Sequence, residues 1–198
     1  MRLQNIVFDL FGVVIYRNHR KCRKELLDFL SFIAEKNTPH FWDEYDRGTI
    51  SMNEALDELA KYRNCNRQFC DCMIEEAIVT QEEIAETKQL ITDLKAAGYK
   101  LYVLSNMSKE FIGYLRKLPV YKEFDGEVVS CELGAIKPEP LIFETLLSKY
   151  SLDASETMFI DDRQTNLNGA LPFGIQTFLF NCQNPENSCS KLRSILLQ

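Results

Sequence analysis

The stretch Ile6-Val7-Phe8-Asp9-Leu10-Phe11-Gly12-Val13-Val14 lies close to the start of the chain and decides its fold. Its first three residues form a short run of β-branched and aromatic side chains, which is typical of a fully buried strand in a parallel sheet. Asp9 ends this run, and Gly12 permits a tight backbone turn after it. An aspartate at the carboxyl end of such a strand lies where open α/β sheets bind ligands. An aspartate is equally typical of a turn cap, so this stretch alone leaves both interpretations open.

Length and composition describe an ordinary globular protein. The 198 residues suit one domain, or a core domain with a smaller insert, and they are 45% apolar and 26% charged. No apolar run approaches the roughly 20 residues that span a bilayer, and the first residues lack the pattern of a signal peptide. We therefore expect a cytoplasmic protein that does not associate with membranes.

Charge and cysteine usage narrow the partners. The net charge is −6 and no basic block is present, which argues against a nucleic-acid partner. The seven cysteines are scattered, and the one cluster, at Cys65, Cys70 and Cys72, has neither the spacing of zinc ligands nor a neighbouring histidine. Free thiols are therefore expected rather than disulfides or a zinc site.

Strand-like and helix-like segments alternate along the second half of the chain. This alternation predicts an α/β fold with a doubly wound parallel sheet and helices on both faces. Further strands are predicted at 100–104, 127–129, 158–160 and 175–180, helices at 140–150 and 166–171, and a polar loop at 181–190 before a short terminal helix.

The segment between the first two strands is helical and too long for a simple crossover. We interpret residues 16–89 as an inserted helical cap, and residues 1–15 and 90–198 as the α/β core. Within this block Gly48 ends one helix, Ser51-Met52-Asn53-Glu54 fits the capping box of the next, and further helices are predicted at 67–77 and 81–97. Trp42 and Tyr45 are more typical of a cap core than of a substrate platform.

Three predicted strands end in polar groups. These are Asp9, Ser105-Asn106 and Asp161-Asp162, and Lys137-Pro138 lies in a loop on the same side. In a doubly wound sheet such strand ends converge on one crevice. Clustered carboxylates repel one another unless a cation neutralises them, and hard oxygen ligands suit Mg²⁺. The set therefore predicts a Mg²⁺ site at which Asp9 attacks a phosphoryl group.

Four ordered motifs carry a family resemblance. They are Phe-Asp-Leu-Phe-Gly-Val-Val at 8–14, Leu-Ser-Asn at 104–106, Ile-Lys-Pro-Glu-Pro at 136–140 and Phe-Ile-Asp-Asp-Arg-Gln-Thr-Asn at 159–166. Together they resemble the haloacid dehalogenase superfamily of hydrolases, and the helical insert lies where that family places its first type of cap. The resemblance implies a Rossmann-like core of subfamily I, similar to the sugar-1-phosphate phosphatase-like members.

The resemblance also implies roles for individual residues. It makes Asp9 the catalytic nucleophile and a metal ligand, with Lys137 as its catalytic partner. Ser105, Asn106 and Lys137 would bind the phosphate of a small phosphorylated substrate. Asp161 and Asp162 would bind Mg²⁺, with Asp162 the more direct ligand, and Asn166 would support this pair. Phe11 would offer its backbone carbonyl to the metal. We expect a monomer or weak homodimer.

Phe11 is the departure from the family pattern. Phosphatases of this family usually carry a second aspartate there, which protonates the leaving group, and general acid catalysis is worth roughly 10²–10⁴-fold. A substrate with a good leaving group, such as an anomeric or acyl phosphate, needs this acid least. His19, beside Arg17 and Arg20, could replace the acid because of its pKa range, although solvated cap surface is the commoner state of such residues.

Two alternative functions stay open. A 2-haloacid dehalogenase needs no leaving-group acid and tolerates an aromatic residue at this position, but the adjacent carboxylates Asp161 and Asp162 favour a hard cation. A catalytically weak binding or regulatory protein could also keep this fold, because fold alone does not determine function.

Overall fold

The computed structural model describes residues 3–34 and 38–197. Its strands are β1 (Asn5–Phe8), β2 (Ile15–Arg17), β3 (Gln81–Glu83), β4 (Lys100–Ser105), β5 (Gly126–Val129), β6 (Thr157–Asp161) and β7 (Gln176–Leu179). Its α-helices are α1 (Lys24–Phe29), α2 (His40–Arg47), α3 (Met52–Arg63), α4 (Arg67–Val79), α5 (Ala85–Ala96), α6 (Lys109–Leu115), α7 (Ser130–Leu133), α8 (Pro140–Tyr150), α9 (Gln164–Ala170) and α10 (Pro185–Leu196).

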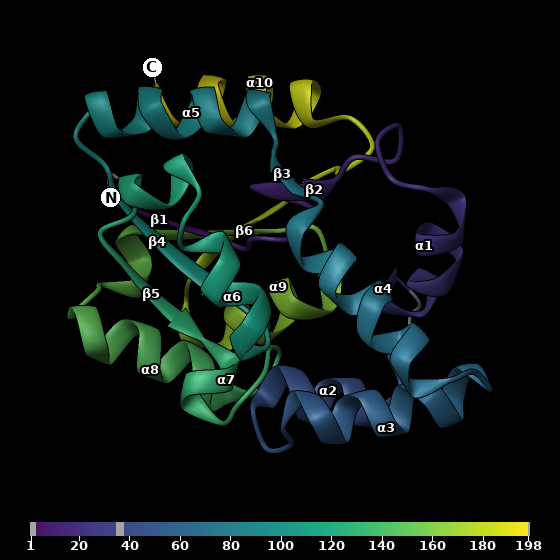
Figure 1. The fold of residues 1–198 in the computed structure, drawn as a ribbon. Helices are drawn as coiled ribbons and strands as arrows, with labels where there is room; N and C mark the ends of the chain where they lie inside the picture. The colour runs from purple at the N-terminus through teal and green to yellow at the C-terminus, as the bar shows by residue number, and fades with distance from the viewer. Residues whose placement is uncertain (1–2, 35–37, 198) are drawn as a thin grey trace.

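β1 is the central strand of a five-stranded parallel sheet with the order β5-β4-β1-β6-β7 (Figure 1). Phe8 at its end aligns with Val103 of β4 and with Ile160 of β6. The residues that follow these three positions therefore meet at one edge of the sheet. The strand order and direction confirm the predicted doubly wound α/β core.

The side chains of β1 alternate between two apolar layers, as the pleat of a strand requires. Ile6 and Phe8 pack in the layer that contains α5 and α10, which lie side by side in Figure 1. Val7 packs in the opposite layer with α8 and α9. All three side chains are fully buried. Because helices cover both faces of the sheet, Ile6, Val7 and Phe8 are apolar at three successive positions.

The helical insert contains α1 to α4, and the antiparallel pair of β2 and β3 lies at its base. Trp42 and Tyr45 are buried, and Trp42 packs edge-on against Phe32, so their prediction as cap core is confirmed. The capping box at Ser51 and the left-handed Gly48 at the end of α2 are also confirmed. The predicted cap boundaries of 16 and 89 stay a prediction.

Two local predictions are wrong. The helix predicted over 81–97 begins at Ala85, because Gln81–Glu83 form β3 and pair with β2. The loop predicted over 181–190 contains the first half of α10, which Asn184 caps by accepting the backbone N–H of Asn187. α10 buries Cys189 and Leu192 against the core, and this packing outweighs the polar composition. No helix within the described ranges has the length and apolar character needed to cross a bilayer.

The C-terminal helix is held by a buried hydrogen bond that can be tested. The Tyr99 hydroxyl donates to the Leu196 carbonyl oxygen over 2.6 Å. Tyr99→Phe should lower the free energy of unfolding by about 1–3 kcal/mol, because the carbonyl is left without a partner. Urea denaturation measures this change. The control is Tyr62→Phe, at a 48% exposed residue of the cap, which should change stability by less than about 0.5 kcal/mol. Equal effects would contradict the assignment.

Candidate active site

Asp9 follows β1 directly and lies at the carboxyl edge of the sheet. Its backbone N–H donates to the Ile160 carbonyl oxygen of β6 over 2.9 Å, and its Oδ1 accepts the Leu10 N–H over 2.7 Å. The Gly12 N–H then closes the following turn on the Ile15 carbonyl oxygen over 2.7 Å. Asp9 therefore caps this turn and also lies at the edge of the sheet where α/β proteins bind ligands. The two interpretations of this aspartate, turn cap and site residue, do not exclude each other.

Lys137 is the cation of this edge. Its side chain is 1% exposed, and its Nζ lies 2.8 Å from Asp9 Oδ1 and 2.7 Å from Asp161 Oδ2. Nζ also donates to the Leu104 carbonyl oxygen over 2.9 Å. An ammonium group has three donors, and these three partners use all of them.

Asn106 holds the loop that carries Lys137. The Asn106 Nδ2 donates to the Lys137 carbonyl oxygen over 3.0 Å, and the Lys137 backbone N–H donates to Asn106 Oδ1 over 2.7 Å. The preceding Ser105 is fully buried, and its Oγ has no hydrogen-bond partner among the residues that the structure describes. A buried hydroxyl without a partner is costly, so Ser105 has hydrogen-bonding capacity that a ligand at this edge could use.

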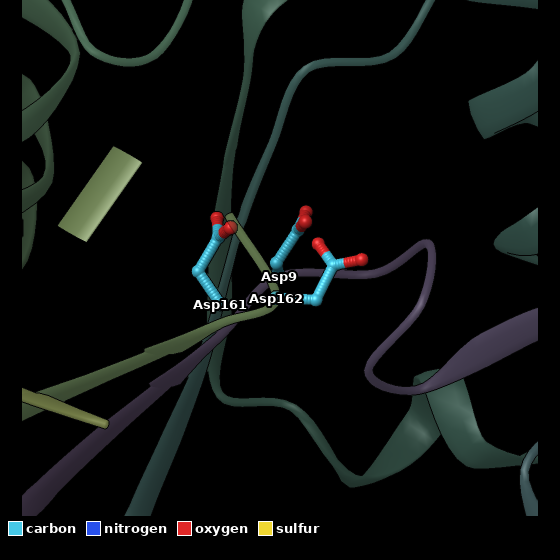
Figure 2. Close-up of side chains that lie close together, drawn as sticks. All are labelled: Asp9, Asp161 and Asp162. Carbon is cyan, nitrogen blue, oxygen red and sulfur yellow. The ribbon is translucent and has the colours of Figure 1, made fainter. Parts of the chain in front are cut away.

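Asp9, Asp161 and Asp162 form the acidic cluster drawn in Figure 2, with carboxylate oxygens within 4.8 Å of one another. Asp161 is held by Asn166, whose Nδ2 lies 3.1 and 3.0 Å from its two oxygens, and by the Arg163 backbone N–H at 2.8 Å. The Asn166 contact agrees with the supporting position that the family resemblance implied for this residue.

Asp162 lies against the turn that follows β1. A Cβ added to Gly12 would lie 2.5 Å from Asp162 Oδ2, and Gly12 has a φ of +86°. A side chain at this position would be strained at this φ and would displace the Asp162 carboxylate. Gly12 therefore lets the third carboxylate approach the other two.

Burial and mutual repulsion set the ionisation of the cluster. Burial raises the pKa of Asp9, Lys137 opposes this, and the two neighbouring aspartates add to it. Burial and Asp161 raise the pKa of Asp162. Burial alone would lower the pKa of Lys137, but Asp161 and Asp9 raise it above its ordinary value. Three ionised carboxylates beside one ammonium leave two uncompensated negative charges, which a divalent cation would neutralise.

Phe11 is partly buried and lies beside a buried arginine. The guanidinium carbon of Arg17 is 5.6 Å from the centre of the Phe11 ring, and its Nη2 donates to the Ala77 carbonyl oxygen over 3.2 Å. Arg17 is only 8% exposed, so the expectation that it belongs to the solvated surface is wrong. His19 is exposed, as expected for solvated cap surface.

Two acidic residues near this edge were missed by the sequence reasoning. Asp43 and Asp46 lie three residues apart on α2, and Asp46 is partly buried. Burial raises the pKa of Asp46 to about 7, and Asp43 and Asp9 add to the effect. The i, i+3 spacing beside the buried Trp42 and Tyr45 was a visible signal. The sequence gives no sign that this helix end packs near the nucleophile edge.

The comparisons with known proteins agree with this geometry. A family model described as haloacid dehalogenase-like hydrolase matches residues 3–174. The chain belongs to this family. D-ribitol-5-phosphate phosphatase from Bacteroides thetaiotaomicron is 26% identical over 201 residues, which cover 93% of each chain. Mouse acyl-CoA dehydrogenase family member 10 is 30% identical over 168 residues, covering 82% of this chain and only 14% of the mouse protein.

Solved structures share the whole architecture. A predicted HAD-like family hydrolase from Porphyromonas gingivalis superposes with a TM-score of 0.76 at 27% identity and covers 100% of both chains. A HAD family enzyme of Bacteroides thetaiotaomicron in complex with magnesium and inorganic phosphate superposes with a TM-score of 0.71 at 22% identity, covering 91% of this chain and 95% of the other. At 22% identity, the second superposition shows a shared fold alone.

The buried ion pairs of Lys137 predict a large stability effect. Lys137→Met should destabilise the protein by about 3–5 kcal/mol, because it leaves the Asp9 and Asp161 carboxylates buried without their cation. Chemical denaturation at neutral pH measures this. The matched control is Lys61→Met, which breaks the exposed pair with Glu58 and should cost at most about 1 kcal/mol. A Lys137 variant as stable as this control would contradict the described site.

Proposed function

We propose that this protein is a Mg²⁺-dependent phosphohydrolase that acts on a small phosphorylated metabolite through an aspartyl-phosphate intermediate. The observation that carries the proposal is the Lys137 ammonium between Asp9 and Asp161, with Asp162 in the same cluster. This group of residues combines a nucleophile, a cation and a surplus of negative charge at one edge of the sheet. Phosphoryl transfer depends mainly on positioning and electrostatic stabilisation, which such a site supplies.

The donor set fits a magnesium ion. Asp9, Asp161 and Asp162 offer hard carboxylate oxygens, and the Phe11 backbone carbonyl follows Asp9 by two residues. The Asp161 oxygens already accept hydrogen bonds from Lys137, Asn166 and the Arg163 backbone, which makes Asp162 the more direct ligand of the acidic pair. When bound, Mg²⁺ would neutralise charge and polarise the phosphoryl oxygens.

The residues of the chain would then act in two steps. The Asp9 carboxylate attacks phosphorus, a bond from its oxygen to phosphorus forms, and the bond to the leaving group breaks. The Ser105 hydroxyl would donate to a phosphoryl oxygen during this transfer, and the Lys137 ammonium, whose three donors are already engaged, would bind the phosphoryl group through its charge. Water then attacks the phosphorus of the aspartyl phosphate, which releases inorganic phosphate and restores the Asp9 carboxylate.

Relatives give further support to a phosphatase. Besides the D-ribitol-5-phosphate phosphatase, a sesquiterpene phosphatase from Aspergillus oryzae is 25% identical and covers 85% of both chains. The two relatives are named for different substrates. Hydrolysis of a phosphate ester is the chemistry that they share, and this supports a phosphatase. The substrate of each protein would depend on its own cap.

Phe11 directs the proposal toward substrates with good leaving groups. Its side chain cannot donate a proton, so an alkoxide would depart without help from this position. The anomeric oxygen of a sugar 1-phosphate is a better leaving group than a simple alkoxide. We therefore propose a sugar 1-phosphate, or a compound of similar leaving-group quality, as the substrate.

Phosphate release tests the proposed reaction. With excess Mg²⁺, the protein should release phosphate from a panel of phosphate esters, and EDTA should abolish the release until Mg²⁺ is added back. Asp9→Asn should lose activity by several orders of magnitude, because the amide cannot serve as the nucleophile. Activity that survives both EDTA and Asp9→Asn would exclude this mechanism.

The same panel separates the alternative functions. Chloride release from a 2-haloacid without added metal would identify a dehalogenase. Absence of turnover on every phosphate, together with tight binding of another protein, would identify a binding or regulatory protein.

A leaving-group series tests the role of Phe11. Values of kcat/KM for p-nitrophenyl phosphate and phenyl phosphate compare two rings of similar size whose leaving groups differ in acidity. The nitrophenyl ester should react at least about 10-fold faster, because no acid at position 11 protonates the poorer leaving group. Equal values would show that another residue supplies the proton.

A further inference from the structure

Cys65 and Cys70 form a pair of neighbouring thiols in the helical insert. Their sulfur atoms lie 3.2 Å apart. Cys65 follows the end of α3, and Cys70 lies in the first turn of α4. All seven cysteines are free thiols in this structure, so the pair is in its reduced state. A disulfide bond requires two cysteines that the backbone holds side by side, and the sulfur atoms of this pair are already in contact.

The turn between α3 and α4 holds the two thiols in place. Asn64 ends α3 in the left-handed conformation, with a φ of 49°, and the Cys65 N–H donates to the Ala60 carbonyl oxygen of α3 over 3.0 Å. Asn66 then caps α4, and its carbonyl oxygen accepts the Cys70 N–H over 3.2 Å. The backbone on both sides of the pair is therefore bound to a helix, and little conformational freedom is lost when the two sulfur atoms bond.

The two thiols differ in their access to solvent. Cys65 is half-buried, whereas Cys70 is fully buried, so a reagent from solution reaches Cys65 first. Burial and the neighbouring Cys65 thiol raise the pKa of Cys70 to about 12. Cys70 is therefore protonated at neutral pH while Cys65 is a free thiol. Once Cys65 has reacted, its thiol no longer raises this pKa, and the Cys70 thiolate forms more readily.

Cys72 is the third thiol of this segment and does not belong to the pair. It lies on α4 two residues after Cys70, and residues at this spacing lie on different sides of a helix. Its side chain is exposed. Within residues 3–34 and 38–197, these three thiols form no group that could hold a metal ion. The arrangement therefore suits thiol–disulfide chemistry rather than metal binding, and Cys72 provides a matched control.

We propose that Cys65 and Cys70 form a reversible redox site, which a small disulfide such as glutathione disulfide oxidises to an intramolecular disulfide bond. The Cys65 thiolate attacks one sulfur of glutathione disulfide, a bond between these two sulfurs forms, and one glutathione leaves as its thiolate. Cys70 then gives its proton to solvent and attacks the Cys65 sulfur, which releases the second glutathione. The two cysteines together lose two electrons, and glutathione disulfide is reduced to two molecules of glutathione.

Contact between the two thiols favours the second of these steps. Cys70 is held against the Cys65 sulfur, so its attack is intramolecular and needs no encounter with another molecule. A glutathione adduct on Cys65 is therefore short-lived. The redox site uses none of the residues of the candidate active site, so this proposal does not depend on the proposed function.

A peptide map of the wild-type protein tests the proposal. The folded protein is incubated with reduced and oxidised glutathione, the reaction is stopped with acid, and the remaining thiols are alkylated and counted. Oxidation should remove two of the seven thiols, and dithiothreitol should restore them. Trypsin cuts after Arg67 and so separates Cys65 from Cys70. The protease Asp-N cuts before Asp71 and so separates Cys70 from Cys72. A disulfide should join the peptides of Cys65 and Cys70, and Cys72 should be alkylated.

Three results of this map would overturn the proposal. The first is a count of seven unchanged thiols in oxidised glutathione. The second is a disulfide that includes Cys72. The third is a lasting glutathione adduct on Cys65 without a bond to Cys70.

Variants and unfolding supply the controls. Cys72→Ser should form the same linked peptides to the same extent as the wild type. Cys70→Ala should stop at the glutathione adduct on Cys65, because the second thiol is absent, and loss of two thiols in this variant would contradict the pairing. In the wild type, unfolding in urea should lower the equilibrium constant for the disulfide by at least about 10-fold, because the fold no longer holds the thiols in contact. Equal constants in the folded and unfolded protein would overturn the proposal without any variant.

Discussion

The Lys137 ammonium, buried between Asp9 and Asp161, is the interaction on which the site depends. Removing this cation from water is costly, and the cost is offset only because each of its three donors has a partner. Those partners come from the ends of three adjacent strands, β1, β4 and β6. The pairing of Lys137 therefore requires this strand order, because a different order would separate the three groups that accept hydrogen bonds from the ammonium.

The same pairing leaves a surplus of negative charge beside it. Lys137 compensates one of the three carboxylates, and Gly12 allows Asp162 to join the other two. A buried excess of this kind destabilises the fold unless a cation binds. The turn after β1 thus has two functions: it ends the strand, and it provides space for the carboxylate that makes the cluster suitable for a divalent ion.

The parts of the site that follow strand ends could be predicted from sequence, because parallel strands bring their carboxyl ends together. Asp9, Asp161 and Asp162 meet as expected for this reason, and Lys137 reaches them from the loop between α7 and α8. β3 could not be predicted, because its residues are polar and the strand forms by pairing with β2. The start of α10 carried a usable signal, since Asn184-Pro185-Glu186 is typical of a helix N-terminus. Asp46 was missed because part of its surroundings, at Ser108 and Arg163, comes from loops more than 50 residues away.

Phe11 does more than leave position 11 without a proton donor. Arg17 is buried beside the Phe11 ring, and its Nε has no hydrogen-bond partner among the described residues. Burial lowers the pKa of Arg17, and an aromatic face stabilises such a cation without adding charge. An aspartate at position 11 would lie near this guanidinium and would tend to form an ion pair with it, which favours the ionised carboxylate over the protonated acid. Phe11 and Arg17 therefore fit each other, because the ring covers the buried guanidinium without adding charge.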